Sequence, residues 1–193
     1  MSPAPVKLTA TPSQTVGPFF HFGLAHNIRL GCLASPDTKG ERVRLRIAVI
    51  DGDGLPVPDA LLEVWQADAD GIYVRPDDPA HALTPPAFCG FGRLASDADG
   101  VCLFETIRPG RIVDASDRFQ ASHINVCVFA RGLLRQLYTR VYFEGDPDLD
   151  RDVVLAQVPS ERRASLTARH RGGEDWSFDI RLQGDRETVF FNV

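Results

Sequence analysis

The sequence lacks long hydrophobic runs and runs of positive charge. None of its 193 residues lie in an apolar segment long enough to span a bilayer, and Met1 to Ala10 lack the charged start and apolar core of a signal peptide. We therefore expect a cytoplasmic protein. The net charge is −5, and no basic run or stacking-aromatic pattern suited to a phosphate backbone is present. Nucleic acid is thereby disfavoured as the main partner.

Cysteine is scarce, and the common nucleotide and hydrolase motifs are missing. Four cysteines, Cys32, Cys89, Cys102 and Cys127, are scattered without a C-x-x-C pair. This pattern fits a reduced compartment better than a disulfide or zinc framework, and we expect all four to be small buried apolar residues. The chain has no P-loop, no dinucleotide fingerprint and no G-x-S-x-G elbow. Phosphate, nicotinamide and hydrolase functions therefore have no support.

Short apolar segments separated by turn residues make up most of the sequence from residue 42 onward. They predict strands at 42–50, 60–65, 101–106, 122–130, 135–143, 153–158, 176–182 and 188–191. A short helix is expected at 160–167, where Ser160 can cap the first turn. Many short strands with punctuating turns indicate an all-β chain folded as a β-sandwich. We expect residues 1–40 to form an N-terminal arm and irregular segment, and residues 41–193 to form the sandwich domain.

The N-terminal arm combines helix-breaking and apolar residues. Two prolines and a glycine between Thr11 and Phe22 predict that it forms no regular helix, so we expect an extended arm. Three phenylalanines in the same segment are too apolar for a free tail. The arm should therefore pack either across its own domain or against a partner subunit, and both alternatives remain open.

The strand expected at 122–130 is the centre of the pattern. Side chains two apart along a strand point the same way, so His123, Asn125 and Cys127 share one face while Ile124 and its apolar neighbours take the other. Two histidines at this spacing would form a compact pair of metal ligands, but an asparagine cannot replace a ring nitrogen as a strong donor. His123 taken alone is better interpreted as a hydrogen-bonded histidine in a half-buried strand.

Four motifs in order resemble the intradiol ring-cleaving dioxygenases. They are Leu62-Glu63-Val64-Trp65-Gln66-Ala67-Asp68 with Gly71-Ile72-Tyr73, Phe91-Gly92-Arg93, Phe104-Glu105-Thr106-Ile107-Arg108-Pro109-Gly110, and Ser122-His123-Ile124-Asn125. The opening Thr-Pro-Ser-Gln-Thr-x-Gly-Pro and a Phe-Ala-Arg-Gly at 129–132 are similar to the α chain of the family's two-chain members. Each motif alone is weak, but their joint occurrence in order covers nearly the whole chain. The resemblance implies the β-sandwich of that family.

Catalytic members of this family bind a ferric ion through two tyrosines and two histidines. Tyr73 and His123 match the first tyrosine and the first histidine, whereas Ile112 and Asn125 stand at the other two positions. Isoleucine offers no lone pair, and an amide oxygen is a weak ligand for iron. The resemblance therefore implies that this chain binds no metal. It implies instead that a homologous catalytic β chain carries Fe(III) and pairs with this chain in a hetero-oligomer.

The resemblance also implies a role for the arm and for one arginine in the substrate pocket at the boundary with the β chain. The matching residues are Thr15, Gly17, Pro18, Phe19 and Arg131. The implied reaction is cleavage of protocatechuate by O2 to 3-carboxy-cis,cis-muconate. Protocatechuate carries a carboxylate opposite its diol, and a guanidinium fork matches a carboxylate. Arg131 is thus expected to orient the substrate, while Phe19, which stands where relatives usually have tyrosine, can line the pocket with its ring.

Two other functions remain open from the sequence. The chain could be a self-sufficient metalloenzyme that uses Tyr73 and His123 in a rearranged site, and metal analysis of the chain purified alone tests this. It could instead be a ligand-binding or scaffold sandwich without catalytic partner, because fold alone never fixes function. Co-purification with a homologous catalytic chain tests that alternative. Arg131 taken alone could also be a solvated arginine at the start of a turn.

Overall fold

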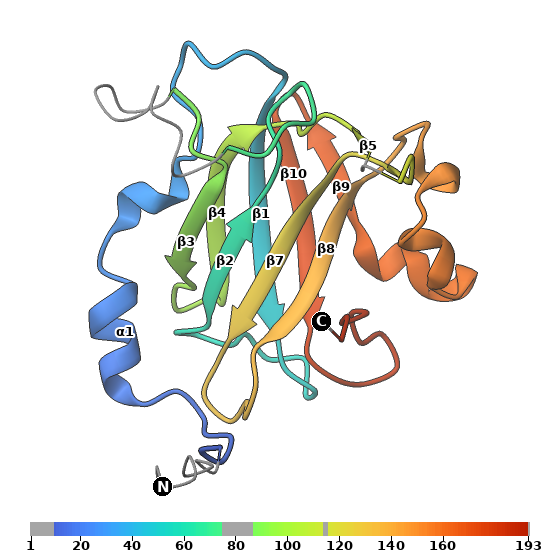
Figure 1. Ribbon diagram of the computed structural model, residues 1–193. Coiled ribbons are helices and arrows are strands. Elements are labelled where there is room, and N and C mark those ends of the chain that lie inside the picture. Colours follow the sequence, from blue (N-terminus) through green and yellow to red (C-terminus); the bar gives the residue numbers. More distant parts are fainter. Residues whose placement is uncertain (1–9, 75–86, 114–115, 193) are drawn as a thin grey trace, which may run out of the picture.

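A computed structural model describes residues 10–74, 87–113 and 116–192 (Figure 1). Eight strands form one sheet in the order β3-β2-β7-β8-β9-β10-β1-β4. Their bounds are β1 Arg42–Ile50, β2 Leu61–Trp65, β3 Phe91–Ala95, β4 Val101–Ile107, β7 His123–Phe129, β8 Leu137–Phe143, β9 Thr167–Gly172 and β10 Asp175–Arg181. A separate two-stranded ribbon pairs β5 (Ile112–Val113) with β6 (Phe119–Gln120).

The sheet folds into two facing layers, which confirms the predicted sandwich. The layer β3-β2-β7-β8 lies in front of β10-β1-β4 in Figure 1, and β9 joins the two layers. The joint is narrow, because β9 pairs with β8 through only Tyr142↔Thr167 and Phe143↔Ala168 before it pairs with β10. Both layers contribute to the apolar core between them, as two facing sheets are expected to do.

Alternating side chains place each layer's apolar face inward. In β1 every second residue from Val43 to Val49 is buried, while Arg44 and Arg46 between them are exposed. In β7 Ile124 and its apolar neighbours Val126 and Val128 belong to the main core, as the period of two predicts.

A second, smaller apolar cluster lies on the outer side of β8. It contains Tyr142 together with the buried residues Ala121, Leu155, Val158 and Leu166. Tyr142 lies in β8 and Ala121 lies just before β7. The other three come from the region after β8, which contains the short 3-10 helices η3 (Leu149–Arg151), η4 (Leu155–Gln157) and η5 (Ser160–Leu166). The outer face that carries His123 and Tyr142 is therefore covered and not open to solvent.

Several expectations about single elements are wrong. The strand expected at 153–158 is the 3-10 helix η4, and the strand expected at 188–191 is reduced to one bridge between Tyr138 and Phe191. The helix expected at 160–167 is present as the 3-10 helix η5, but Ser160 donates to Glu161 and does not cap it. Strands β3, β5, β6 and β9 were not predicted.

The arm and the cysteines also differ from expectation. Instead of staying extended throughout, the arm forms the α-helix α1 (Pro18–Leu24), with Pro18 at its first position. Proline is tolerated there because the first helical N–H has no intrahelical partner. A second short element, η1 (Ile28–Gly31), follows it. Cys102 and Cys127 are buried as expected, whereas Cys32 and Cys89 are exposed.

Within the described residues, no helix combines the length and the apolar character needed to cross a membrane.

Candidate functional site

The structure brings the arm to the turn that carries Arg131. The hydroxyl Oγ1 of Thr15 accepts a hydrogen bond from the backbone N–H of Gly132 at 2.8 Å, although the two residues are 117 positions apart. Further along the arm, the ring of Phe20 lies 5.4 Å from that of Phe129, the last residue of β7. The arm thus crosses its own domain at the end of β7, on both sides of Arg131.

Gly17, Phe19 and Arg131, which lie near these two contacts, face solvent. Phe19 is 84% exposed, and a side-chain carbon at Gly17 would meet open space. Arg131 is exposed, and its guanidinium makes no ion pair or hydrogen bond within the described part of the chain. Pro18 is placed by its backbone as the first residue of α1. The predicted pocket residues therefore gather around one exposed tip of the molecule.

The resemblance matches Tyr73, Ile112, His123 and Asn125 to the family's metal ligands, and these positions lie near the outer face of β7 and β8. The amide Nδ2 of Asn125 donates to the Tyr73 hydroxyl at 3.0 Å. Asn125 stands opposite Arg140 in the β7–β8 register, and Ile112 stands opposite Gln120 in the β5–β6 ribbon. Tyr73 and Asn125 are thus joined directly, while Ile112 is connected to them through Gln120, which accepts a hydrogen bond from Arg140.

His123 is held by a single hydrogen bond. Its Nδ1 lies 2.8 Å from the carbonyl oxygen of Ala121, and because a carbonyl only accepts, Nδ1 carries the proton. The other ring nitrogen, Nε2, is buried without a hydrogen-bond partner. Burial, assisted by the positive charge of Arg140, lowers the pKa of His123 to about 4. The ring is therefore neutral at pH 7.

Arg140 places a cation beside these positions. Its Nη1 donates to Oε1 of Gln120 at 2.9 Å and lies 3.5 Å from the hydroxyl of Tyr142. That hydroxyl in turn donates to Asp152, a fully buried carboxylate, at 3.1 Å. Burial raises the pKa of Tyr73, and the hydrogen bond from Asn125 and the charge of Arg140 oppose this without reversing it. Both Tyr73 and His123 are thus held in their neutral forms.

These residues do not fit a ferric ion. Only the Tyr73 hydroxyl oxygen and His123 Nε2 remain as strong metal ligands. Asn125 uses its amide N–H in a hydrogen bond to Tyr73, and the positively charged guanidinium of Arg140 lies beside them. Ile112 supplies no donor atom. Across the residues that the structure describes, no group of three or more histidine, cysteine, aspartate or glutamate side chains could hold a metal.

Sequence reasoning did not find Gln120, Arg140, Tyr142 or Asp152. The alternation of β8 puts Arg140 and Tyr142 on one face, but only the β7–β8 register shows that this face meets His123 and Asn125. Asp152 ends an acidic segment, 145–152, that its composition indicates is a solvated loop, but it is fully buried and accepts bonds from the backbone N–H groups of Val154 and Leu155. Nothing local in the sequence identifies these contacts.

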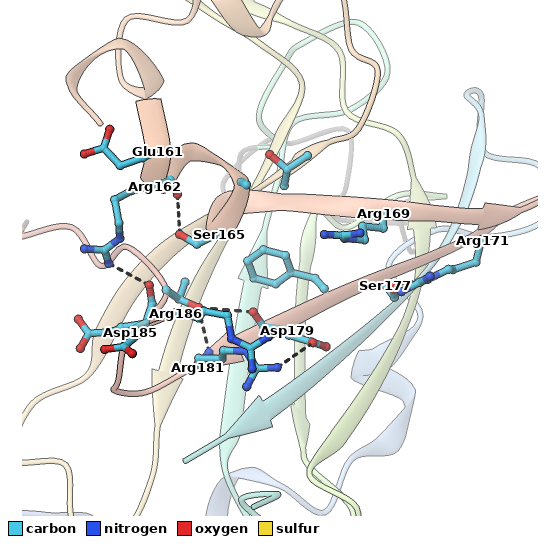
Figure 2. A pocket seen from close by; sticks show the side chains of 15 residues that line it. Glu161, Arg162, Ser165, Arg169, Arg171, Ser177, Asp179, Arg181, Asp185 and Arg186 are labelled. Carbon is cyan, nitrogen blue, oxygen red and sulfur yellow. Dashed lines mark hydrogen bonds and ion pairs between the residues drawn. The ribbon is translucent and has the colours of Figure 1, made fainter. Parts of the chain in front are cut away.

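A pocket of about 310 Å³ lies elsewhere, between η5, β9, β10 and the segment 185–188 (Figure 2). Five arginines and four acidic residues line it: Arg162, Arg169, Arg171, Arg181, Arg186, Glu161, Asp179, Asp185 and Glu187. Some of these charges pair within the pocket, as Arg181 does with Asp179 at 3.7 Å. Mixed charge of this kind gives no strong field for an anionic substrate. None of the predicted site residues lines the pocket.

Sequence comparisons find a matching family model and several similar proteins. A family model described as Dioxygenase matches residues 16–184. The chain is 42% identical to the protocatechuate 3,4-dioxygenase alpha chain of Burkholderia cepacia, over 96% of this chain and 98% of that protein. It is 39% identical to the alpha chain of Pseudomonas putida, over 96% and 97% of the two chains. The beta chain of the Burkholderia cepacia enzyme is 34% identical over 83% of this chain and 72% of its own length.

Solved structures agree on the fold. The crystal structure of 3-chlorocatechol 1,2-dioxygenase from Rhodococcus opacus 1CP superposes with a TM-score of 0.62 at 22% identity, over 78% of this chain and 62% of that one. The dioxygenase domain of a carbohydrate-binding fusion protein from Streptomyces sp. SirexAA-E superposes with a TM-score of 0.60 at 23% identity, over 98% and 97% of the two chains. At this identity the likeness concerns the fold alone.

Proposed function

This chain belongs to the intradiol dioxygenase family, and on that premise we propose that it is the non-catalytic α subunit of a protocatechuate 3,4-dioxygenase. The observation that carries the proposal is the exposed tip formed by the arm and Arg131, in a chain whose own ligand positions hold Ile112 and Asn125. Such a chain can complete a pocket but cannot supply the metal centre.

The partner in this proposal is a homologous β chain that holds Fe(III), which activates the diol of the substrate toward O2. Both atoms of O2 enter the product, so that protocatechuate becomes 3-carboxy-cis,cis-muconate. The present chain contributes binding and orientation. Arg131 pairs with the substrate carboxylate, and an unpartnered guanidinium is available for this because no acidic residue in the described part of the chain neutralises it.

The arm supplies the surface that meets the β chain. Phe19 and Phe22 are three positions apart on α1 and are 84% and 72% exposed, so both rings project from the side of the helix that does not contact Phe129. Exposed aromatic residues are enriched in the cores of protein interfaces. We place the assembly in the cytoplasm, for which the scattered free cysteines are the support.

Co-expression with and without the β chain tests this function. The two chains should co-purify, and the mixed enzyme should cleave protocatechuate with uptake of O2, whereas the present chain alone should show no turnover. A β chain prepared alone is the matched control. Full activity of the β chain without this chain, or failure of the two to associate, would contradict the proposal.

A further inference from the structure

Arg131 occupies the second position of a tight turn between β7 and β8. The backbone N–H of Leu133 donates to the carbonyl of Ala130 at 3.2 Å, which closes a four-residue turn over Arg131 and Gly132. Gly132 has φ +91°, in the left-handed region. This combination matches a type II turn, which needs glycine or asparagine at its third position.

The type of this turn determines the direction of the peptide between Arg131 and Gly132. Types I and II differ by a flip of the peptide plane between the second and third residues, here between Arg131 and Gly132. The flip reverses the N–H of Gly132, while the Cα–Cβ bond of Arg131 keeps its direction. In the observed turn this N–H points to the arm, where Oγ1 of Thr15 accepts it at 2.8 Å. The hydroxyl of Thr15 can therefore accept this N–H only in the observed orientation of the peptide.

We propose that Thr15 is a positioning residue for Arg131, which acts by tying the Arg131–Gly132 peptide to the arm and so fixing the place of the turn that carries Arg131 relative to the arm. The inference rests on the proposed function, in which Arg131 pairs with the substrate carboxylate. It assigns Thr15 a role within its own chain. The contact between Phe20 and Phe129 anchors the arm on the other side of Arg131, and keeps the hydroxyl within reach of the turn.

A double-mutant cycle in the assembled enzyme tests this role. Thr15→Val keeps the shape of the side chain but removes the acceptor, and should lower kcat/KM for protocatechuate about threefold to tenfold, as expected for one hydrogen bond. Thr15→Ser should stay close to the wild type. The double variant T15V/R131A should be no worse than R131A alone, because Thr15 has nothing left to position. Thr11→Val, at another exposed threonine of the arm, is the matched control and should have no effect.

Hydrogen exchange gives a readout that does not depend on turnover. The amide of Gly132 should exchange faster in Thr15→Val than in the wild type or in Thr11→Val, since it loses its acceptor. Gly132→Ala is a second variant for the same turn. A methyl group at position 132 would meet no atom within 4 Å, but the backbone angle φ of +91° at this position is unfavourable for alanine. Gly132→Ala should therefore lower kcat/KM, as Thr15→Val does.

The outcomes separate this inference from the proposed function. Unchanged kcat/KM for protocatechuate in R131A would overturn the role of Arg131 itself. A clear loss in R131A, with no loss in Thr15→Val or with losses that multiply in the double variant, would overturn the positioning role and leave the proposed function standing. Unchanged exchange of the Gly132 amide in Thr15→Val would also overturn it.

Discussion

Arg131 is exposed and lies at the end of a strand, with its guanidinium unpaired in the described structure. Replacing it with alanine should lower kcat/KM for protocatechuate roughly tenfold to a hundredfold, because a charge-assisted hydrogen bond contributes about 1.5 to 3 kcal/mol. Arg131→Lys should recover only part of this, since an ammonium cannot form the planar fork. Steady-state kinetics of the assembled enzyme measures both values.

Catechol provides the control substrate for this variant, because it has no carboxylate to pair. The loss in Arg131→Ala should be much smaller for catechol than for protocatechuate. Arg135→Ala, at an exposed arginine just after the same turn, should change neither substrate's kinetics. Equal losses for both substrates in Arg131→Ala would mean that the arginine supports the pocket and does not read the charge of the substrate.

His123 should make the stability of the fold depend on pH. Its pKa is about 4 in the folded chain and about 6.5 when exposed, so between these values the unfolded state binds more protons. The free energy of unfolding should then fall as the pH drops from 6.5 toward 4, by up to about 3 kcal/mol from this residue. Urea unfolding at pH 7 and pH 4.5, compared with His123→Phe, isolates this contribution. The variant should show a smaller drop, and an equal drop would contradict the burial of a neutral ring.

Individual residues differ in how far the sequence alone reveals them. The replacement of two ligands by Ile112 and Asn125 follows from the family motifs, and the period of two places His123 and Asn125 on one face. Gln120 and Arg140 could not be assigned to that face, because their approach depends on pairing between strands that periodicity does not specify. Likewise, no sequence pattern links Thr15 to Gly132.

At the scale of elements, the contribution of the arm to assembly and substrate binding can be tested by removing it. Removing residues 1–22 takes away the exposed rings of Phe19 and Phe22 and the hydroxyl of Thr15 together. The truncated chain should associate more weakly with the β chain or raise the KM for protocatechuate, because interface burial and pocket completion are lost. Size-exclusion chromatography and kinetics of the mixed enzyme measure the two effects.

A matched pair of variants sharpens this test. Phe19→Ser with Phe22→Ser keeps the helix and Thr15 but removes the apolar surface, so it should weaken association while leaving the turn at Arg131 intact. Normal assembly and normal turnover after removal of residues 1–22 would exclude a role for the arm.

Errors in the expected elements have identifiable physical causes. The helix α1 was missed because its proline occupies the first helical position, where it is compatible with a helix. Strand β9 was missed because its sequence, Thr-Ala-Arg-His-Arg-Gly, is mostly polar and exposed, and it forms by pairing with its neighbours. The segment 153–158 is apolar because η4 and its flanking residues cover Tyr142, which gives it the composition of a strand.

At the scale of the whole molecule, periodicity and turn residues are sufficient to predict the sandwich but not the order of its strands. The first strand, β1, lies between β4 and the last strand, β10, where Leu45 stands opposite Trp176. Such pairing joins residues over 100 positions apart, and local patterns contain no information about it. The surroundings of Asn125 and of Arg131 depend on other contacts between distant residues, such as Trp65 opposite Asn125 and Thr15 bonded to Gly132.

The whole chain should therefore fold without iron. Purified alone, it should contain far less than one equivalent of iron and show no visible phenolate-to-iron band, because two donors are missing and Tyr73 and His123 are held neutral beside Arg140. Metal analysis and absorption spectroscopy measure this, with the assembled α/β enzyme, prepared in parallel, as the control that should contain both iron and the band. One equivalent of iron on the isolated chain, with a band that disappears in Tyr73→Phe, would show that the chain holds a rearranged metal site of its own.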